Sequence, residues 1–86
     1  MADNEHPVIP ASEVLAKIEK GESVEYDNVI IKGDLDINGL NLSQEEGKPV
    51  ITSQISITNS RIDGYIKFHG VIFKKDINFR GTLLSR

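Results

Sequence analysis

The sequence predicts an all-β solenoid, and two observations carry this prediction. The first is a repeat: five stretches that begin at Val24, Leu35, Ile55, Ile66 and Ile77 align at a step of eleven residues. The second is alternation within each stretch, because apolar residues recur two positions apart, as on one face of a β-strand. A fixed period of this kind is typical of solenoids, in which each unit buries its apolar face by stacking on its neighbours.

The predicted core consists of the apolar columns of the repeat. The first column is formed by the five residues that begin the stretches. The third column holds Tyr26, Ile37, Ile57, Phe68 and Phe79, and the eighth holds Ile31, Leu42, Ile62, Phe73 and Leu84. Ile51 falls on the eighth column in the irregular stretch between, which we interpret as a third unit that is two residues short and bulges outward at Gly47, Lys48 and Pro49.

The segment before the repeat divides into an arm and a helix. Residues 1–10 are polar and contain two prolines, which predicts an extended, partly mobile arm. Residues 11–22 predict a short helix, with Ser12 as the N-cap and Gly21 at the C′ position. Its apolar face holds Val14, Leu15 and Ile18. A helix of two to three turns is marginal alone, so we expect this face to cap the first coil of the solenoid.

Residues 23–86 form the predicted solenoid domain, with strands joined at corners. The fifth column of the repeat holds residues that tolerate the left-handed conformation of a tight turn. These residues are Asn28, Gly39, Asn59, Gly70 and Gly81. Each unit therefore makes two sides, and two units should close one square turn.

Column seven should point outward, yet it is apolar in alternate units at Ile30, Val50 and Ile72. We expect these residues to form one stripe, because odd units would stack on one side and even units on the other. Three interpretations remain open: the stripe binds a partner, the arm covers it through Val8 and Ile9, or it is incidental surface.

The pentads VIFKK, INFRG, IKFHG, LDING and LNLSQ resemble pentapeptide repeats. The resemblance covers about residues 24–86 and implies a right-handed quadrilateral β-helix, here of about three coils with a short N-terminal α-helix cap. The preceding helix is similar to the capping helix of some members. This chain departs from the pattern by one extra residue after every second pentad, at Asp34, Tyr65 and Asp76. For most of the family no biochemical activity is known.

Composition excludes several classes of site. The 86 residues make one small domain without cysteine, so a disulfide framework and a thiolate metal site are absent. No apolar run could span a bilayer and no apolar signal core is present, which predicts a cytoplasmic protein without a membrane partner. Residues 1–47 carry eleven acidic and three basic side chains, whereas residues 48–86 carry two and seven. This polarity favours head-to-tail contact, or the charges merely solvate outward faces.

One stretch matches the calcium loop of the EF-hand, in which carboxylates and an amide surround a hard cation. Its ligand positions would be Asp34, Asp36, Asn38 and Glu45, around Gly39. No helix pattern flanks the loop, and the solenoid core requires the leucines and isoleucine within it. We therefore expect no metal site, and we keep a calcium-binding module at residues 34–45 as a minor alternative.

The sequence offers little for catalysis. His6 and His69 lie in the arm and at an outward corner, and no nucleophile elbow, phosphate loop or metal-ligand spacing accompanies them. A narrow solenoid filled with aliphatic and aromatic side chains also leaves no interior pocket for a cofactor or small-molecule substrate. Nucleic-acid binding would depend on a weak basic patch. The patch comprises Lys67, Lys74, Lys75 and Arg80.

The sequence therefore favours a non-enzymatic protein-interaction or structural module without a cofactor. No helix follows to cover Phe79, Leu83 and Leu84 in the last repeat, and a solenoid needs a cap at each end. Either the chain is the first part of a longer protein, or two copies cover one another in a homodimer, which we favour. The resemblance also suggests a DNA-mimicking inhibitor of a type II topoisomerase, but mimicry needs a long acidic rod, and this chain has a basic end.

Overall fold

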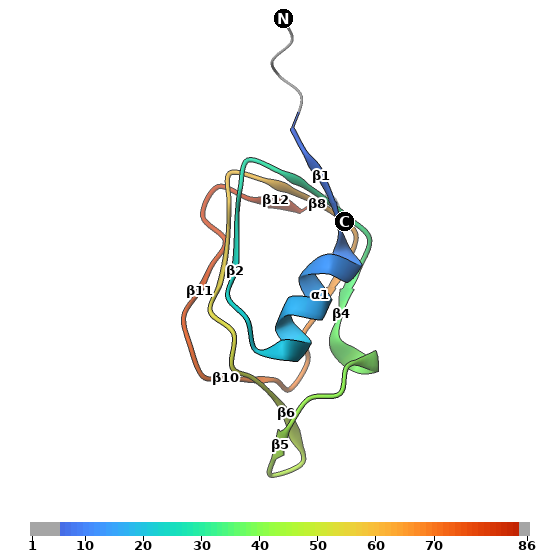
Figure 1. Cartoon of the computed structure of the whole chain (residues 1–86), viewed down its shortest axis with the longest axis vertical. Helices are drawn as coiled ribbons and strands as arrows, with labels where there is room; N and C mark the ends of the chain where they lie inside the picture. The colour runs from blue at the N-terminus through green and yellow to red at the C-terminus, as the bar shows by residue number, and fades with distance from the viewer. Residues whose placement is uncertain (1–5, 85–86) are drawn as a thin grey trace, which may run out of the picture.

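The structure, a computed structural model, describes residues 6–84 as a strand-rich fold with one α-helix and several sheets of parallel strands. The chain begins with β1 (Val8–Pro10) and α1 (Ala11–Lys20). It then runs along the sides of a rectangle, which Figure 1 views nearly end-on. We call residues 24–54 the first pass, residues 55–76 the second and residues 77–84 the third.

Apart from the extra strand β5, each pass contributes one strand to each side that it reaches. The first pass contains β2 (Val24–Asp27), β3 (Ile30–Lys32), β4 (Leu35–Asp36) and β6 (Lys48–Ile51), with a 3-10 helix (Ile37–Gly39) and β5 (Gln44–Glu45) between the last two. The second pass contains β7 (Ile55–Thr58), β8 (Arg61–Asp63), β9 (Ile66–Lys67) and β10 (Ile72–Phe73). The third contains β11 (Ile77–Asn78) and β12 (Leu83–Leu84).

The strands form four sheets, one on each side of the rectangle. Their orders are β1-β3-β8-β12, β11-β7-β2, β4-β9 and β10-β6-β5. Every pairing is parallel except the β5–β6 hairpin, which projects from one corner in Figure 1. Part of the predicted arm is thus a strand, since Val8 pairs in register with Ile30.

Strand partners on successive passes are separated by constant intervals along the chain. Ile55 pairs with Ile77 and Val50 pairs with Ile72, and both intervals are twice the eleven-residue step of the repeat. Across the first pass the interval is longer, as between Val24 and its partner Ile55. The first pass therefore holds nine residues more than the second, and they form the 3-10 helix and the hairpin.

The predicted third unit is confirmed in part. Ile51 keeps the register of the eighth column, since it pairs with Phe73, but residues 37–49 do not form two further sides of the rectangle. The outward bulge at Gly47 is confirmed as the turn of the β5–β6 hairpin, where Glu46 and Gly47 both have positive φ, at 55° and 77°.

The predicted helix is present, and Gly21 ends it in the left-handed conformation with φ 75°. Val14 and Ile18 are buried beneath it. Ser12 is not the N-cap, because the helix begins at Ala11 directly after the extended Pro10, and no side chain caps it. Ala11 is itself buried, so packing rather than a cap determines where the helix starts.

The corners largely follow the sequence prediction. Asn28 and Asn59 adopt positive φ of 65° and 51°, and Gly70 and Gly81 do the same. The asparagine corners stack, since the Asn28 N–H donates to the Thr58 carbonyl at 3.0 Å. Gly39 is the exception, because it lies in the 3-10 helix.

Two buried serines provide a matched test of polar burial. The Ser60 hydroxyl accepts from the Val29 N–H at 3.0 Å and donates to the Thr58 carbonyl at 2.7 Å. The Ser53 hydroxyl is equally buried but has no hydrogen-bond partner within residues 6–84.

Replacing Ser53 with alanine is therefore expected to raise the free energy of unfolding by about 1 kcal/mol, since an unpaired buried hydroxyl is removed. Ser60→Ala is expected to lower it by about 1–3 kcal/mol, because the Val29 N–H loses its acceptor. Urea denaturation measures both values, and a loss of stability in Ser53→Ala would contradict the assignment.

Candidate interaction surface

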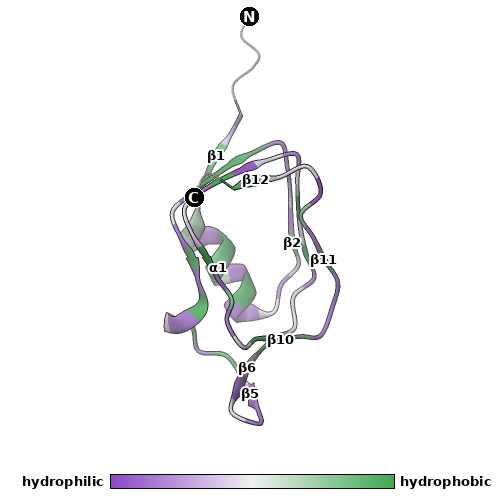
Figure 2. Cartoon of the chain, turned by 180° about the vertical axis from the view of Figure 1, so that it is seen from behind, coloured by the Kyte–Doolittle hydropathy of each residue, from purple (hydrophilic) through white to green (hydrophobic). Residues whose placement is uncertain are grey.

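The two ends of the molecule differ in how they are covered. α1 lies over one end, where it packs on β1, β2 and β4. The view from behind in Figure 2 looks onto the opposite end, formed by the second and third passes, and within residues 6–84 no helix covers it. We call this opposite end the open end.

Exposure rises towards the open end along the first and eighth core columns. In the first column the exposed fraction is 0% for Val24, 1% for Ile55 and 37% for Ile77, which are register neighbours. In the eighth column, Ile62 is fully buried and its neighbour Leu84 is 50% exposed. Side chains of the same repeat position therefore change from core to surface only because no further pass follows within the described residues.

Aromatic side chains extend this apolar surface. Phe68, Phe73 and Phe79 are half-buried and pack against the core from the open end. The rings of Phe68 and Phe73 meet edge to face with centroids 5.8 Å apart. Like the aliphatic columns, these rings lie on the sequence positions that predict core, but they are only partly covered.

The predicted stripe of Ile30, Val50 and Ile72 does not form one surface. Ile30 lies in the β1-β3-β8-β12 sheet, whereas Val50 and Ile72 are partners in the β10-β6-β5 sheet on the opposite side of the rectangle. Val50 is also only 5% exposed, so it offers little surface to a partner. The odd/even pattern predicts the wrong side for Ile30 because the nine-residue insertion shifts the later units by two sides of the rectangle, which is half a turn.

A different outward ladder replaces the stripe. Val8, Ile30, Arg61 and Leu83 are register neighbours on the four strands of one sheet. Val8 and Leu83 are 56% and 64% exposed, the highest fractions among the large apolar residues that the structure describes. The interval from Val8 to Ile30 equals that from Arg61 to Leu83 and is twice the repeat step, which is the signal in the sequence that could have identified this ladder.

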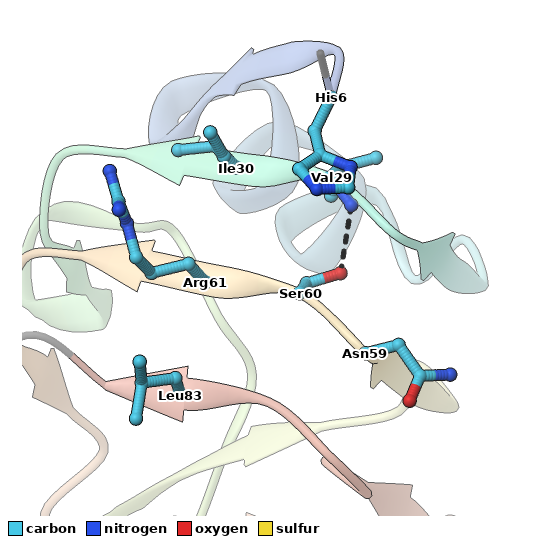
Figure 3. Close-up of a pocket in the computed structure, with 7 residues that line it drawn as sticks. All are labelled: His6, Val29, Ile30, Asn59, Ser60, Arg61 and Leu83. Carbon is cyan, nitrogen blue, oxygen red and sulfur yellow. Dashed lines mark hydrogen bonds between the residues drawn. The ribbon is translucent and has the colours of Figure 1, made fainter. Parts of the chain in front are cut away.

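A shallow depression of about 220 Å³ lies on this ladder (Figure 3). Its lining residues are His6, Val29, Ile30, Asn59, Ser60, Arg61 and Leu83. The Arg61 guanidinium is held by Asp63 at 3.0 Å, and Ser60 is engaged with Val29. The polar groups are thus largely paired, and the depression has the character of a surface contour rather than a reaction site.

Basic side chains lie around the open end, but none lies on β12. Lys67 lies on β9, and Lys74 and Lys75 follow β10, where Lys74 pairs with Glu45 at 3.1 Å. Arg80 lies at the corner before β12. Residues 82–84, which include β12, carry no charge.

The acidic side chains of the calcium-loop pattern make other contacts. Asp34 accepts from the Tyr65 N–H at 2.8 Å, and Asp36 accepts from the Asn38 N–H at 2.9 Å to cap the 3-10 helix. Glu45 pairs with Lys74 from the hairpin. Across the described range 6–84, no three His, Cys, Asp or Glu side chains form a group that could hold a metal ion. Asp34, Asp36 and Glu45 each serve a structural contact in this arrangement.

Among the described residues, the largest pKa shift belongs to Tyr26, whose side chain helps to pack α1 against the strands. The Tyr26 hydroxyl donates to Glu13 on α1 at 2.6 Å, and the Lys17 ammonium lies 4.9 Å from the ring centroid. Burial, followed by the hydrogen bond and the charge of Glu13, raises the pKa of Tyr26 to about 12. This contact links α1 to β2. It was not identified from the sequence.

Stability should consequently fall as the pH rises from about 10 to about 12. In this window the unfolded chain loses the Tyr26 proton while the folded chain retains it, so ionisation favours unfolding. Tyr26→Phe is expected to show a weaker loss of stability over the same range. Equal pH dependence of denaturation in the two proteins would contradict this role.

No protein-family model matches the chain, and comparisons with curated proteins and with solved structures return no match. Among the described residues, no helix is long and apolar enough to cross a membrane.

Proposed function

We propose that this protein is a non-enzymatic protein-association module, built on a short right-handed β-helix of the pentapeptide-repeat type, and that it forms a homodimer through the open end. The observation that carries the proposal is the difference between the ends. α1 buries one end of the core, whereas Ile77 and Leu84 leave the other exposed.

The β-helix interpretation is supported by the pairing registers. On three sides of the rectangle, including β1 on β3, parallel partners recur at twice the eleven-residue step. The longer interval across the first pass is accounted for by one insertion. Two repeat units thus close one turn, as a four-sided coil requires. Right-handed crossover is the strongly preferred connection between parallel strands.

Association is supported by the chemistry of the open end. Exposed side chains that continue a core column lose water-accessible apolar surface when another protein covers them. Contiguous apolar surface of this kind marks interaction sites in soluble proteins. By contrast, among the described residues His6 is the one lining side chain of the depression that could act as an acid or base, and the Ser60 hydroxyl is already bonded to Val29 and Thr58, which favours binding over catalysis.

Because the covered end is polar, the partner that best suits the open end is the open end of a second copy. The outer face of α1 is exposed and mostly polar, through Ser12, Glu13, Ala16, Glu19 and Lys20. Head-to-tail stacking would place this polar face on the apolar open end and bury only one apolar surface. A two-fold contact between two open ends buries both, and two-fold dimers are the commonest small assemblies.

Sedimentation equilibrium over a wide protein concentration range tests the proposal, with Leu84→Asp as the disruptive variant. Because Leu84 is half exposed, the substitution should preserve the fold, as judged by circular dichroism. It should weaken dimerisation by at least about tenfold, since a charge enters the apolar contact.

Val8→Asp is the matched control. Val8 is similarly exposed but lies on β1, at the end covered by α1, so this variant should dimerise like the natural protein. A natural protein that stays monomeric at all concentrations would overturn self-association, and so would a Leu84→Asp variant that dimerises with unchanged affinity.

A further inference from the structure

We propose that the dimer forms by antiparallel pairing of β12 with its own copy, which joins two four-stranded sheets into one of eight strands. This inference rests on the proposed function, because it specifies how two open ends would meet. The partner is a second copy of this chain, and the contact is an extension of a sheet rather than side-chain packing alone.

The choice of β12 follows from the strand edges that face the open end. These edges belong to β9, β10, β11 and β12, the last strands of their sheets. Charged side chains on or beside an edge strand oppose pairing with another chain. β9 contains Lys67, β10 is followed by Lys74 and Lys75, and Asp76 precedes β11.

β12 has no charged residue on it or directly next to it, and the nearest charged residues in the sequence are Arg80 and Arg86, three positions before and two positions after the strand. Its two residues are Leu83 and Leu84, and Thr82 precedes them. The other edge of the same sheet is β1, which begins after Pro7 and ends at Pro10. Proline cannot donate to a strand partner and is a common device for blocking an edge. One edge of this sheet is therefore blocked, and the strand at the other edge carries no charged side chain.

The hydrogen-bond geometry of β12 determines the register across the contact. The Leu83 N–H donates inward to the Ser60 carbonyl at 2.9 Å, so the backbone groups of Leu83 face β8 and those of Leu84 face the free edge. Antiparallel pairing about a two-fold axis then lets each Leu84 N–H donate to the carbonyl of the partner's Thr82. Leu83 lies on the axis, in the wide position between two pairs of hydrogen bonds, opposite the partner's Leu83.

This register brings the outward ladder into the contact. Residues directly opposite in an antiparallel pair share one face of the sheet, so the exposed Leu83 side chains of the two copies would touch. Each would lose much of its 64% exposure. In the wide position the two Cα atoms lie about 4.5 Å apart, within the range of about 4.4–6.8 Å that a disulfide spans.

Disulfide cross-linking tests this register directly, because the natural chain has no cysteine. Leu83→Cys should cross-link to its own copy almost completely under mild oxidation. Asn78→Cys is the matched control, since Asn78 also points outward from a strand at the open end, on β11. It lies away from the proposed axis and should remain uncross-linked. Non-reducing electrophoresis separates the two forms.

The outcomes distinguish this inference from the proposed function. Cross-linking through position 78 and not position 83 would overturn the β12 pairing while leaving the dimer intact. A dimer by sedimentation that cross-links at neither position would also overturn the pairing. Monomers by sedimentation, without cross-links, would remove the proposed function as well.

Discussion

Replacing Gly64 with alanine is expected to destabilise the protein by about 3 kcal/mol or more, which is a large part of the stability of so small a domain. A Cβ at this position would lie 2.2 Å from the Gly33 carbonyl oxygen and 2.5 Å from its carbon. These atoms belong to the backbone of the preceding pass, so no side-chain rotation can relieve the contact.

The surrounding hydrogen bonds prevent the two passes from moving apart. The Gly33 N–H donates to the Asp63 carbonyl at 3.1 Å, and the Leu35 N–H donates to the Tyr65 carbonyl at 2.8 Å. The Tyr65 N–H in turn donates to the Asp34 carboxylate. Accommodating a methyl group at Gly64 requires loss of part of this network between β3–β4 and β8–β9.

Gly39→Ala is the matched control. No atom lies within 4 Å of a Cβ at Gly39, and its φ is not positive, so alanine should be neutral or stabilising by up to about 1 kcal/mol. Urea denaturation midpoints measure both variants. A loss below about 1 kcal/mol in Gly64→Ala would show that the passes are not held as closely as the structure indicates.

The sequence predicts the inward columns well because their signal is local and redundant. Ile55, Ile57 and Ile62 are buried as their two-residue alternation indicates, and each is supported by the same columns in neighbouring units. The left-handed corners at Asn28 and Asn59 are predictable for a similar reason, since few residue types adopt that conformation.

The number of sides in the first pass is less accessible to sequence reasoning. Leu42 satisfies the column spacing although it lies in no strand, whereas Ile51 does continue the eighth column beside Phe73. Only strand pairing shows that Val50 lies beside Ile72 and not in line with Ile30. Glu46 and Gly47 do provide a local signal for a two-residue hairpin turn, but a weaker one than the usual Asn-Gly. A nine-residue insertion thus moves the candidate surface to another side of the molecule.

The candidate interaction surface is predicted in part. The apolar columns of the last repeat are evident from the sequence, because the repeat continues into Phe79 and Leu84. The outward ladder that ends at Leu83 is not, because its members lie on four strands and include Arg61. The double repeat step links Val8 with Ile30 and Arg61 with Leu83 in the sequence, but joining the two pairs across the longer first pass requires the register of β3 on β8.

Alanine substitutions along one core column should lose their effect towards the open end. Ile55→Ala is expected to cost about 2–5 kcal/mol, since Ile55 is 1% exposed between Val24 and Ile77 and its truncation leaves a cavity. Ile77→Ala removes the same atoms from the next pass, where 37% of the residue is already exposed. In dilute solution we expect a cost of only about 1 kcal/mol.

Protein concentration separates the contribution of the fold from that of association. Ile55 is covered by its own chain, so the cost of Ile55→Ala should not depend on concentration. If a second copy covers the open end, Ile77 becomes part of a buried contact, and the cost of Ile77→Ala should rise as the dimer becomes populated. Thermal or urea denaturation of both variants at low and high protein concentration measures this difference. Equal costs for the two variants in dilute solution would contradict an exposed third pass, because the same side chain would then be equally buried at both positions.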